Sequence, residues 1–304
     1  MESVLKIVLA ENFRAVFYAP FYACLELGFF RTQGLEVELV ASPSPGAGIA
    51  AMIDGATHLV WGGPLRVLKD RDVSPVGPDS LVAFGEVATR DPFCLVGSAA
   101  LEPFELSRLL ELRLATVSEV PTPWLCLQED LRDLGVDPAR IVRASEGSME
   151  GNLNALAQGQ VDVIQVFEPF VTRAELRGIG ISLQAASGRG PTAYTSFITT
   201  TSHLSRYDAA FRAMAAAIRS FPPWLASEGS VALARVVRGY YPHVEDEVLA
   251  RSLARYQAAH LWSCRPEISR AGFDRLAQSM QNSGFIRTRA PYESCVAPWA
   301  IESA

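Results

Sequence analysis

Residues 51–60 read AMIDGATHLV, and residues 155–164 read ALAQGQVDVI. Both stretches have the pattern of a helix end, a glycine that stops the helix and a short apolar strand. A strand and a turn of small residues precede each stretch, and a loop follows it, Trp61-Gly62-Gly63-Pro64 in the first and Phe167-Glu168-Pro169 in the second. Two such β-turn-α-β units predict two similar lobes that face each other across a crevice. In α/β proteins, ligands bind in such a crevice, beyond the carboxyl ends of the strands.

Length and composition are those of a globular protein with two domains. The chain has 304 residues, of which 49% are hydrophobic and 20% charged, and this is enough apolar material for two cores. No apolar run approaches the roughly 18 residues that a membrane-spanning helix needs, so we expect no direct insertion into a membrane. The net charge is −6 and the arginines are scattered among acids, which argues against nucleic acid and anionic membranes as partners.

The N-terminus and the cysteines bear on the compartment. Residues 1–10 hold one cation, Lys6, and a short apolar stretch that predicts the first strand, so no signal peptide is evident. Either a leader is missing from this chain or the protein works in the cytosol. The five cysteines are odd in number and widely spaced, without a CxxC pair or a Cys/His ligand spacing. We therefore expect neither a disulfide framework nor a metal site, and no cofactor.

The order of the predicted elements indicates one lobe inserted into another. Residues 1–96 are expected to form the first part of lobe I, residues 97–192 to form lobe II, and residues 193–304 to return to lobe I and add the C-terminal helices. Two of these helices are expected at about 244–259 and 269–283. The two crossings between the lobes predict a hinged clamp.

The turn before the first repeated helix holds small residues. Gly46-Ala47-Gly48-Ile49-Ala50-Ala51 formally matches a dinucleotide fingerprint. The acid that should end the next strand is missing, because that strand runs into Trp61-Gly62-Gly63, so we reject a nicotinamide site. Two interpretations of Gly46 and Gly48 are equally favoured: they form an anion cradle at a helix N-terminus, or they merely make a tight turn.

Trp61, Gly62 and Gly63 are the stronger candidates in lobe I. Adjacent glycines let backbone amides approach a ligand, and an indole ring offers the ligand a flat wall. The alternative for Trp61 is core packing. Arg66, one turn into the next helix, could pair with an acidic group of the ligand or could be solvated.

Lobe II has a matching cradle at residues 118–124, which read SEVPTPW. Proline near a helix start fits the missing N–H of the first turn. Ser118 and Thr122 bring hydroxyls, Trp124 brings an aromatic ring, and Glu119 lies between them. We expect these four residues to line the cleft.

Four further candidates lie in the second repeat and near the second crossing. Glu146 opens the next helix, where it binds ligand or is simply a favourable first-turn charge. Phe167 and Glu168 follow a strand with a buried pattern, and the carboxylate could bind an amino or ring-nitrogen donor of a ligand or form a salt bridge near the hinge. Arg189 lies close to the second crossing, where it binds ligand or braces the hinge.

Catalytic motifs are absent from the sequence. It contains no GxSxG elbow, no P-loop and no HExxH motif. The four histidines are far apart, and His58 lies at a strand start, where a structural role is favoured. Cys24 lies on an apolar helix face, which is typical of the core. We therefore expect no catalytic residues.

Several motifs keep their order and spacing over nearly the whole chain. They are Gly28-Phe29-Phe30, Gly34-Leu35-Glu36-Val37-Glu38-Leu39, Gly135-Val136-Asp137-Pro138, Gly159-Gln160-Val161-Asp162 and Phe167-Glu168-Pro169. Together they resemble the periplasmic substrate-binding proteins of the nitrate, sulfonate, taurine and thiamine-pyrimidine-precursor branch. Later stretches are most similar to the pyrimidine-precursor binders, namely Tyr240-Tyr241-Pro242, Ser269-Arg270-Ala271-Gly272-Phe273 and Pro291-Tyr292-Glu293.

The resemblance implies an α/β fold of the two-lobed type II periplasmic-binding-protein class. Each lobe would be a mixed sheet flanked by helices, with the ligand cleft between the lobes. The family's pocket loops correspond to residues 12–18, 46–48, 61–64, 118–124 and 167–168, which adds Asn12, Phe13 and Tyr18 to the expected ligand-binding residues. Three departures are the absent leader, the absent cysteine-rich motif and histidine of the related pyrimidine synthases, and Pro222-Pro223, which interrupts a helix that usually continues.

The resemblance also implies a function. The chain would be the solute-binding component of an ABC import system, with permease and ATPase partners and a periplasmic or cell-surface location. The expected solute is small and either aromatic or heterocyclic (pyrimidine-like) or an organic anion, captured by hinge closure. The rival is a cytosolic enzyme on the same fold, of the pyrimidine synthase, desulfinase or decarboxylase type, and a third alternative is a ligand-sensing domain that docks on a partner.

Overall fold

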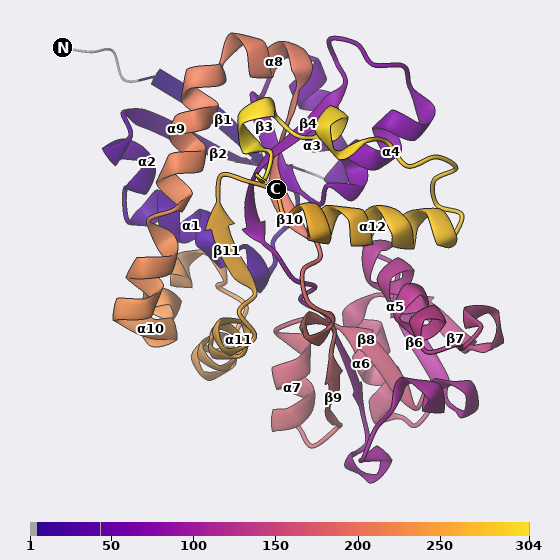
Figure 1. The fold of residues 1–304 in the computed structure, drawn as a ribbon. Coiled ribbons are helices and arrows are strands. Elements are labelled where there is room, and N and C mark those ends of the chain that lie inside the picture. The colour runs from indigo at the N-terminus through magenta and orange to yellow at the C-terminus, as the bar shows by residue number, and fades with distance from the viewer. Residues whose placement is uncertain (1–4, 43, 304) are drawn as a thin grey trace.

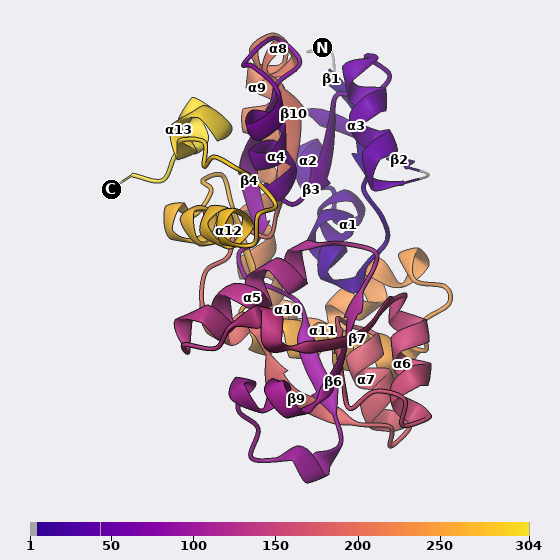
Figure 2. The ribbon, with the colours of Figure 1, turned by 90° about the vertical axis from the view of Figure 1, so that its right-hand side faces the viewer.

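The protein consists of two lobes joined by two crossing segments (Figure 1). The computed structural model describes residues 5–42 and 44–303. Each lobe is built on one β-sheet with helices packed against it, and two views at right angles show one lobe above the other (Figures 1 and 2). No helix in this described part of the chain has the length and apolar character that a membrane crossing requires.

Lobe I holds a six-stranded sheet in the order β11-β4-β10-β3-β1-β2. β1 runs parallel to β2 and β3, whereas β10 runs antiparallel to β3 and β4. The central strands β3, β4 and β10 are buried along their whole length, as expected for strands covered on both faces. The strands span Leu5–Glu11 (β1), Leu35–Ala41 (β2), Leu59–Gly62 (β3), Leu81–Ala88 (β4), Thr195–Thr200 (β10) and Trp262–Arg265 (β11).

Lobe II holds a five-stranded sheet in the order β7-β6-β8-β5-β9. β6 runs parallel to β7 and β8, and β5 runs antiparallel to β8 and β9. The strands span Cys94–Gly97 (β5), Arg113–Val117 (β6), Val142–Gly147 (β7), Val163–Val166 (β8) and Ile181–Ala185 (β9).

The two sheets repeat one arrangement. The order β2-β1-β3-β10 of lobe I recurs in lobe II as β7-β6-β8-β5, with three parallel strands followed by an antiparallel one. The two sequence repeats supply β2 and β3 in one sheet and β7 and β8 in the other. The predicted two-lobed α/β fold with mixed sheets is therefore confirmed.

Helices pack on both sides of each sheet. In lobe I, α1, α2 and α9 pack together on one side, and α4, α12 and α13 pack together on the other (Figure 1). In lobe II, α6 and α7 pack together, and α5 lies across the sheet from them (Figure 2). The helices span Ala19–Glu26 (α1), Phe29–Thr32 (α2), Pro45–Ile53 (α3), Leu65–Val73 (α4), Thr122–Asp133 (α5), Met149–Ala157 (α6), Phe170–Leu176 (α7), Thr201–Arg206 (α8), Asp208–Ile218 (α9), Phe221–Val237 (α10), Asp246–Ala258 (α11), Arg270–Asn282 (α12) and Tyr292–Cys295 (α13).

The boundary between the two lobes was expected after residue 96, but it lies one strand earlier, before β5. β5 pairs with β8 and β9 in the lobe II sheet and not with the strands of lobe I. The chain therefore enters lobe II through the segment 89–93 and leaves it through the segment 186–194. Backbone hydrogen bonds join these two crossing segments. The N–H of Thr192 donates to the carbonyl of Thr89 at 2.7 Å, and the N–H of Ala186 donates to the carbonyl of Phe93 at 2.9 Å.

The C-terminal helices connect the two lobes. α12 packs against α5, and α11 packs against α7 (Figure 1). α12 begins where the Ser269 side chain accepts a hydrogen bond from the N–H of Gly272, and it buries Phe273, Leu276 and Met280 at helical spacing. α10 and α11 pack against each other and place the stretch between them beside the cleft.

One buried carboxylate in the lobe I sheet predicts a pH dependence of stability. Glu86 of β4 is fully buried, and it accepts hydrogen bonds from Arg265 and Ser263, each at 3.3 Å. Burial raises the pKa of Glu86 from 4.5 to about 7, although Arg265 opposes the shift. Folded Glu86 thus holds a proton that the unfolded chain has lost between about pH 4.5 and 7, so the free energy of unfolding falls as pH rises through that window.

Glu86→Gln is therefore expected to gain stability relative to the unmodified chain as pH rises from 5 to 8, because the amide never ionises. Urea unfolding at both pH values measures the difference. Glu38→Gln is the matched control, since Glu38 is half-exposed in its ion pair with Lys6. A stability difference for Glu86→Gln that does not change with pH would show that Glu86 keeps an ordinary pKa.

Candidate functional site

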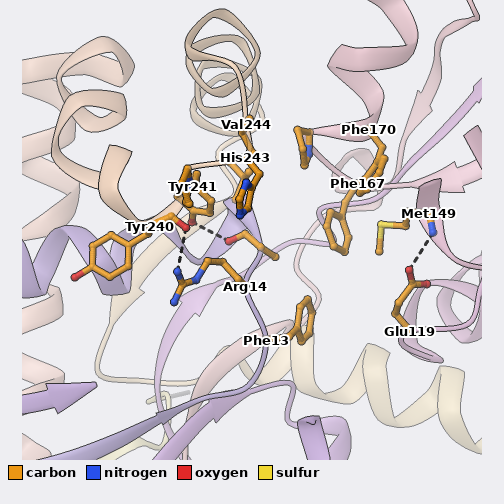
Figure 3. A pocket seen from close by; sticks show the side chains of 14 residues that line it. Phe13, Arg14, Glu119, Met149, Phe167, Phe170, Tyr240, Tyr241, His243 and Val244 are labelled. Carbon is orange, nitrogen blue, oxygen red and sulfur yellow. Dashed lines mark hydrogen bonds between the residues drawn. The ribbon is translucent and has the colours of Figure 1, made fainter. Parts of the chain in front are cut away.

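The main cavity of the protein lies between the lobes and has a volume of about 620 Å³. Lobe I contributes the loop 13–16, the stretch 240–244 before α11 forms a second wall, and lobe II contributes residues from the starts of α6 and α7 (Figure 3). The lining is mainly apolar and aromatic. Its lobe II members are Glu119, Met149, Phe167, Pro169 and Phe170.

Phenylalanine rings from both lobes meet at this cavity. The ring of Phe13 stacks on that of Phe167, with 6.4 Å between centroids and 22° between planes. Phe167 also has edge contacts with Phe17 at 5.2 Å and Phe93 at 5.0 Å. Phe167 is therefore held rigidly by the hinge side of both lobes, whereas Phe13 is only half-buried and faces the cavity.

The charged groups that line this cavity are already satisfied within the protein. Arg14 binds Glu11 through Nη2 at 2.7 Å and Nε at 2.9 Å, and its Nη1 donates to the carbonyl of Tyr240 (Figure 3). Glu119 accepts a hydrogen bond at 2.9 Å from the N–H of Met149, the first residue of α6. A carboxylate there also interacts favourably with the helix dipole. The cavity thus favours an apolar guest.

A second, smaller recess of about 50 Å³ adjoins the main cavity, and Phe13 lines both. α4 and α5 both begin at this recess. Arg66 of α4 donates to Asn12 Oδ1 at 3.3 Å, and Asn12 Nδ2 in turn contacts the Tyr18 hydroxyl at 3.4 Å. Removal from water lowers the pKa of Arg66 and raises that of Tyr18.

Gly63 shows why the loop after β3 needs a residue without a side chain. A Cβ atom at this position would lie 3.2 Å from the carbonyl oxygen of Tyr194, in the segment that returns from lobe II directly before β10. Glycine therefore lets the loop approach the hinge closely, and this contact sets one wall of the recess.

Eight of the seventeen expected site residues line these two spaces. They are Asn12, Phe13, Tyr18, Gly63, Arg66, Glu119, Thr122 and Phe167. They come from the loops that follow β1, β3, β6 and β8 and from the first turns of the helices that follow β3 and β6. The cleft expected at the carboxyl ends of these strands is thus where the structure gathers them.

Both tryptophan candidates lie away from the cavities. Trp61 is fully buried in the core of lobe I, where its ring stacks on that of Phe21 at 4.4 Å. Trp124 packs on the smaller core of lobe II, with the guanidinium of Arg143 over its ring at 4.9 Å. Of the two interpretations of Trp61, core packing is the one that the structure supports.

Two carboxylates expected at the site have protein partners elsewhere. Glu168 is fully buried and accepts hydrogen bonds from Arg255 Nε at 2.6 Å and from the Thr172 hydroxyl at 2.9 Å. Glu146 is exposed and pairs with Arg143 at 2.8 Å. Glu168 therefore joins lobe II to α11, in agreement with the salt-bridge interpretation.

Arg189 braces the hinge. Its guanidinium binds Asp91 at 2.6 Å and Asp130 at 2.9 Å, and all three side chains are buried or nearly so. Arg275 of α12 binds Asp130 as well, at 2.9 Å. The four residues link the crossing segments, α5 and α12 in one network, and Arg189 does not reach the cavities.

The remaining candidates also lie outside the two spaces. Gly46 is exposed in the first turn of α3, and Gly48 is buried against Val60. Gly62 lies behind the Arg66 side chain, and Ser118 is exposed. Both glycines lie within α3 itself and not in a turn that precedes it.

The sequence missed one wall of the main cavity. Residues 240–244, Met149, Phe170 and Tyr194 line the two spaces but were not expected there. The aromatic pair Tyr240-Tyr241, directly before a helix, was the available signal. Its position depends on the packing of α10 and α11, which a local pattern does not reveal.

The described residues offer little nucleophilic chemistry. All five cysteines are buried, and burial raises the pKa of Cys94 and Cys126 to about 12, so their thiols stay protonated. His58 accepts a hydrogen bond from the N–H of Val8 at 2.9 Å, which makes it structural. Among residues 5–42 and 44–303, no three His, Cys, Asp or Glu side chains could together hold a metal ion.

Known proteins are similar to this chain in sequence and in fold. The sequence model of the NMT1/THI5-like family matches residues 16–220. The "Putative binding protein YtlA" of Bacillus subtilis is 23% identical over 300 residues, which cover 97% of this chain and 88% of that protein.

Two solved structures show the same fold. The periplasmic aliphatic sulphonate binding protein SsuA of Escherichia coli superposes with a TM-score of 0.75 at 13% identity, over 96% of this chain and 97% of that one. The desulfurization enzyme DSZB superposes with a TM-score of 0.66 at 11% identity, over 96% of each chain. The predicted resemblance is confirmed: the chain has the fold of the periplasmic binding proteins and belongs to the NMT1/THI5-like family.

Proposed function

We propose that this protein is the solute-binding component of an ABC import system and that it captures a small solute with an aromatic or heterocyclic body between its lobes. The observation that carries the proposal is the apolar cavity of about 620 Å³, walled by aromatic side chains from both lobes. Its volume falls within the range of about 300–1,000 Å³ that is typical of small-molecule sites.

Closure of the lobes supplies the affinity in this proposal. Micromolar capture needs about 8 kcal/mol, whereas each ring contact with Phe13 or Phe167 contributes about 0.5–1.5 kcal/mol beyond the burial of area. A solute must therefore touch both lobes and expel water from the whole cavity. The bound state is a closed clamp whose population the solute increases, and a transporter can recognise that state.

The known relatives support the class of function and the location. YtlA and SsuA are both named as binding proteins, and SsuA is periplasmic. By this similarity we propose permease and ATPase partners and a site of action outside the cytoplasm. The rival function, a cytosolic enzyme, is favoured by one observation, the fold shared with DSZB, and it predicts that a bound compound is consumed.

Phe13→Ala tests the cavity. We expect this variant to bind the solute about 10 to 100 times more weakly, because it removes a ring worth about 1.5–3 kcal/mol of apolar burial. Isothermal titration calorimetry measures the loss, with ligands found first by a thermal-shift screen of pyrimidines, aromatic acids and sulfonates. Phe29→Ala is the matched control, a half-buried phenylalanine on α2 outside both spaces, and we expect it to change affinity by less than about threefold. Equal losses in the two variants would contradict the assignment of the cavity.

A further inference from the structure

We infer that the solute carries an acidic group and that Arg66 binds this group in the small recess beside the aromatic cavity. The inference rests on the proposed function and adds the chemical class of the solute, an organic carboxylate or sulfonate with an aromatic or similarly bulky apolar body. Arg66 is then the residue that sets the specificity for charge.

Arg66 differs from the other arginines between the lobes. Arg14, Arg189 and Arg255 each bind a carboxylate, at 2.7, 2.6 and 2.6 Å respectively. Arg66 is partly buried, and its one side-chain hydrogen bond among the described residues goes to the neutral amide of Asn12. Within residues 5–42 and 44–303, no carboxylate lies within ion-pair distance of it.

The residues around Arg66 favour a bound anion over a bound cation. No acidic residue lines the recess, whereas the hydroxyl-bearing residues Tyr18, Thr122 and Tyr194 do. α4 and α5 both begin there, so their partial positive charges add to that of the guanidinium. Burial of a cation is costly unless it is paired, and the lowered pKa of Arg66 reflects this cost. A bound acid would relieve it.

The volumes of the two spaces predict that the solute has a small acidic head in the recess and a larger body in the aromatic cavity. The recess, at about 50 Å³, has room for a few atoms of the size of water, which suits a carboxylate or sulfonate group. The aromatic cavity is about 620 Å³ and takes the rest. Because Phe13 lines both spaces, one molecule can occupy them together. Nitrate or taurine would fill the recess and leave the aromatic cavity empty of solute.

A pair of probes that differ only in charge tests the inference on the unmodified protein. Phenylacetate and phenylacetamide share the ring and the carbonyl, but only the first is an anion. We expect phenylacetate to bind about 10 to 100 times more tightly in isothermal titration calorimetry, since hydrogen bonds to charged groups contribute about 1.5–3 kcal/mol. Equal affinities, or tighter binding of the amide, would overturn the inference.

Variants of Arg66 test whether this residue causes the preference for the acid. Arg66→Gln is expected to lower the affinity for phenylacetate to that for phenylacetamide. The affinity for phenylacetamide itself should change by less than about threefold. Arg66→Lys keeps the charge and should keep part of the preference for the acid. The control is Arg31→Gln, because Arg31 is an exposed arginine on α2 that lines neither space. This variant should bind phenylacetate more tightly than phenylacetamide by the same factor as the unmodified protein.

The outcomes separate this inference from the proposed function. A merely structural role of Arg66 would weaken both probes equally in Arg66→Gln and would overturn the inference alone. Failure of both probes to bind the unmodified protein would count against the aromatic-solute function and, with it, against the inference.

Discussion

Trp61→Ala is expected to lower the free energy of unfolding by about 3–5 kcal/mol, the usual cost of deleting a large aromatic side chain from a core. The side chain is completely buried, and its ring contacts those of Phe21 at 4.4 Å and Tyr22 at 5.4 Å. Its indole N–H has no hydrogen-bond partner in the described structure, so the loss comes from packing and not from a lost hydrogen bond. Urea unfolding measures it.

Trp224→Ala is the control for this prediction. Trp224 is only partly buried on α10, so its loss leaves a smaller cavity and should cost less. If Trp61→Ala unfolded like the unmodified chain and instead bound solute poorly, Trp61 would be a wall of the ligand site and the placement in the core would be wrong.

Arg189→Met is expected to destabilise the protein by about 3–5 kcal/mol as well, for a different reason. It leaves Asp91, which is fully buried, and Asp130, which is nearly so, without their shared cation, and an uncompensated buried charge is costly. The deficit should shrink at low pH, because burial already raises the pKa of Asp91 and a protonated Asp91 no longer needs the cation. Urea unfolding at two pH values measures both effects.

Arg113→Met is the matched control for the hinge. Its ion pair with Asp162 has a similar length, 2.8 Å, but both side chains are substantially exposed. Exposed pairs contribute about 0–1 kcal/mol. Equal deficits in Arg113→Met and Arg189→Met would mean that the network at the hinge does not brace the crossing segments.

Most of the fold could be predicted because it is repeated locally. A strand, a small-residue turn, a helix with a glycine stop and a second strand occur twice, and each copy lies within about 30 residues. β5 was assigned to the wrong lobe because Cys94–Gly97 is a short apolar strand that could be buried in either sheet. Its partners in β8 and β9 lie far along the chain, and only long-range pairing decides between the sheets.

The site was predictable where it depends on the ends of strands and was missed where it depends on distant contacts. Phe13, Arg66 and Thr122 follow strands whose carboxyl ends meet at the cleft, so their positions follow from the topology. Glu168 looks equally available in the sequence, but its carboxylate accepts hydrogen bonds from Arg255, 87 residues away, and from Ser252 and Thr172. The two interpretations of Arg189, ligand binding and bracing of the hinge, stay open in the sequence for the same reason, since its partner Asp91 is 98 residues distant.

The measurement that tests the central claim most directly is native mass spectrometry of the protein mixed with aromatic carboxylates, aromatic sulfonates, pyrimidines, taurine and nitrate. A solute receptor of the proposed kind gives one complex, whose mass is that of the chain plus one intact aromatic acid, and the Phe13→Ala variant loses this complex. No complex with any of these compounds, or conversion of one of them into a product of different mass during incubation, would contradict capture of an unchanged solute between the lobes.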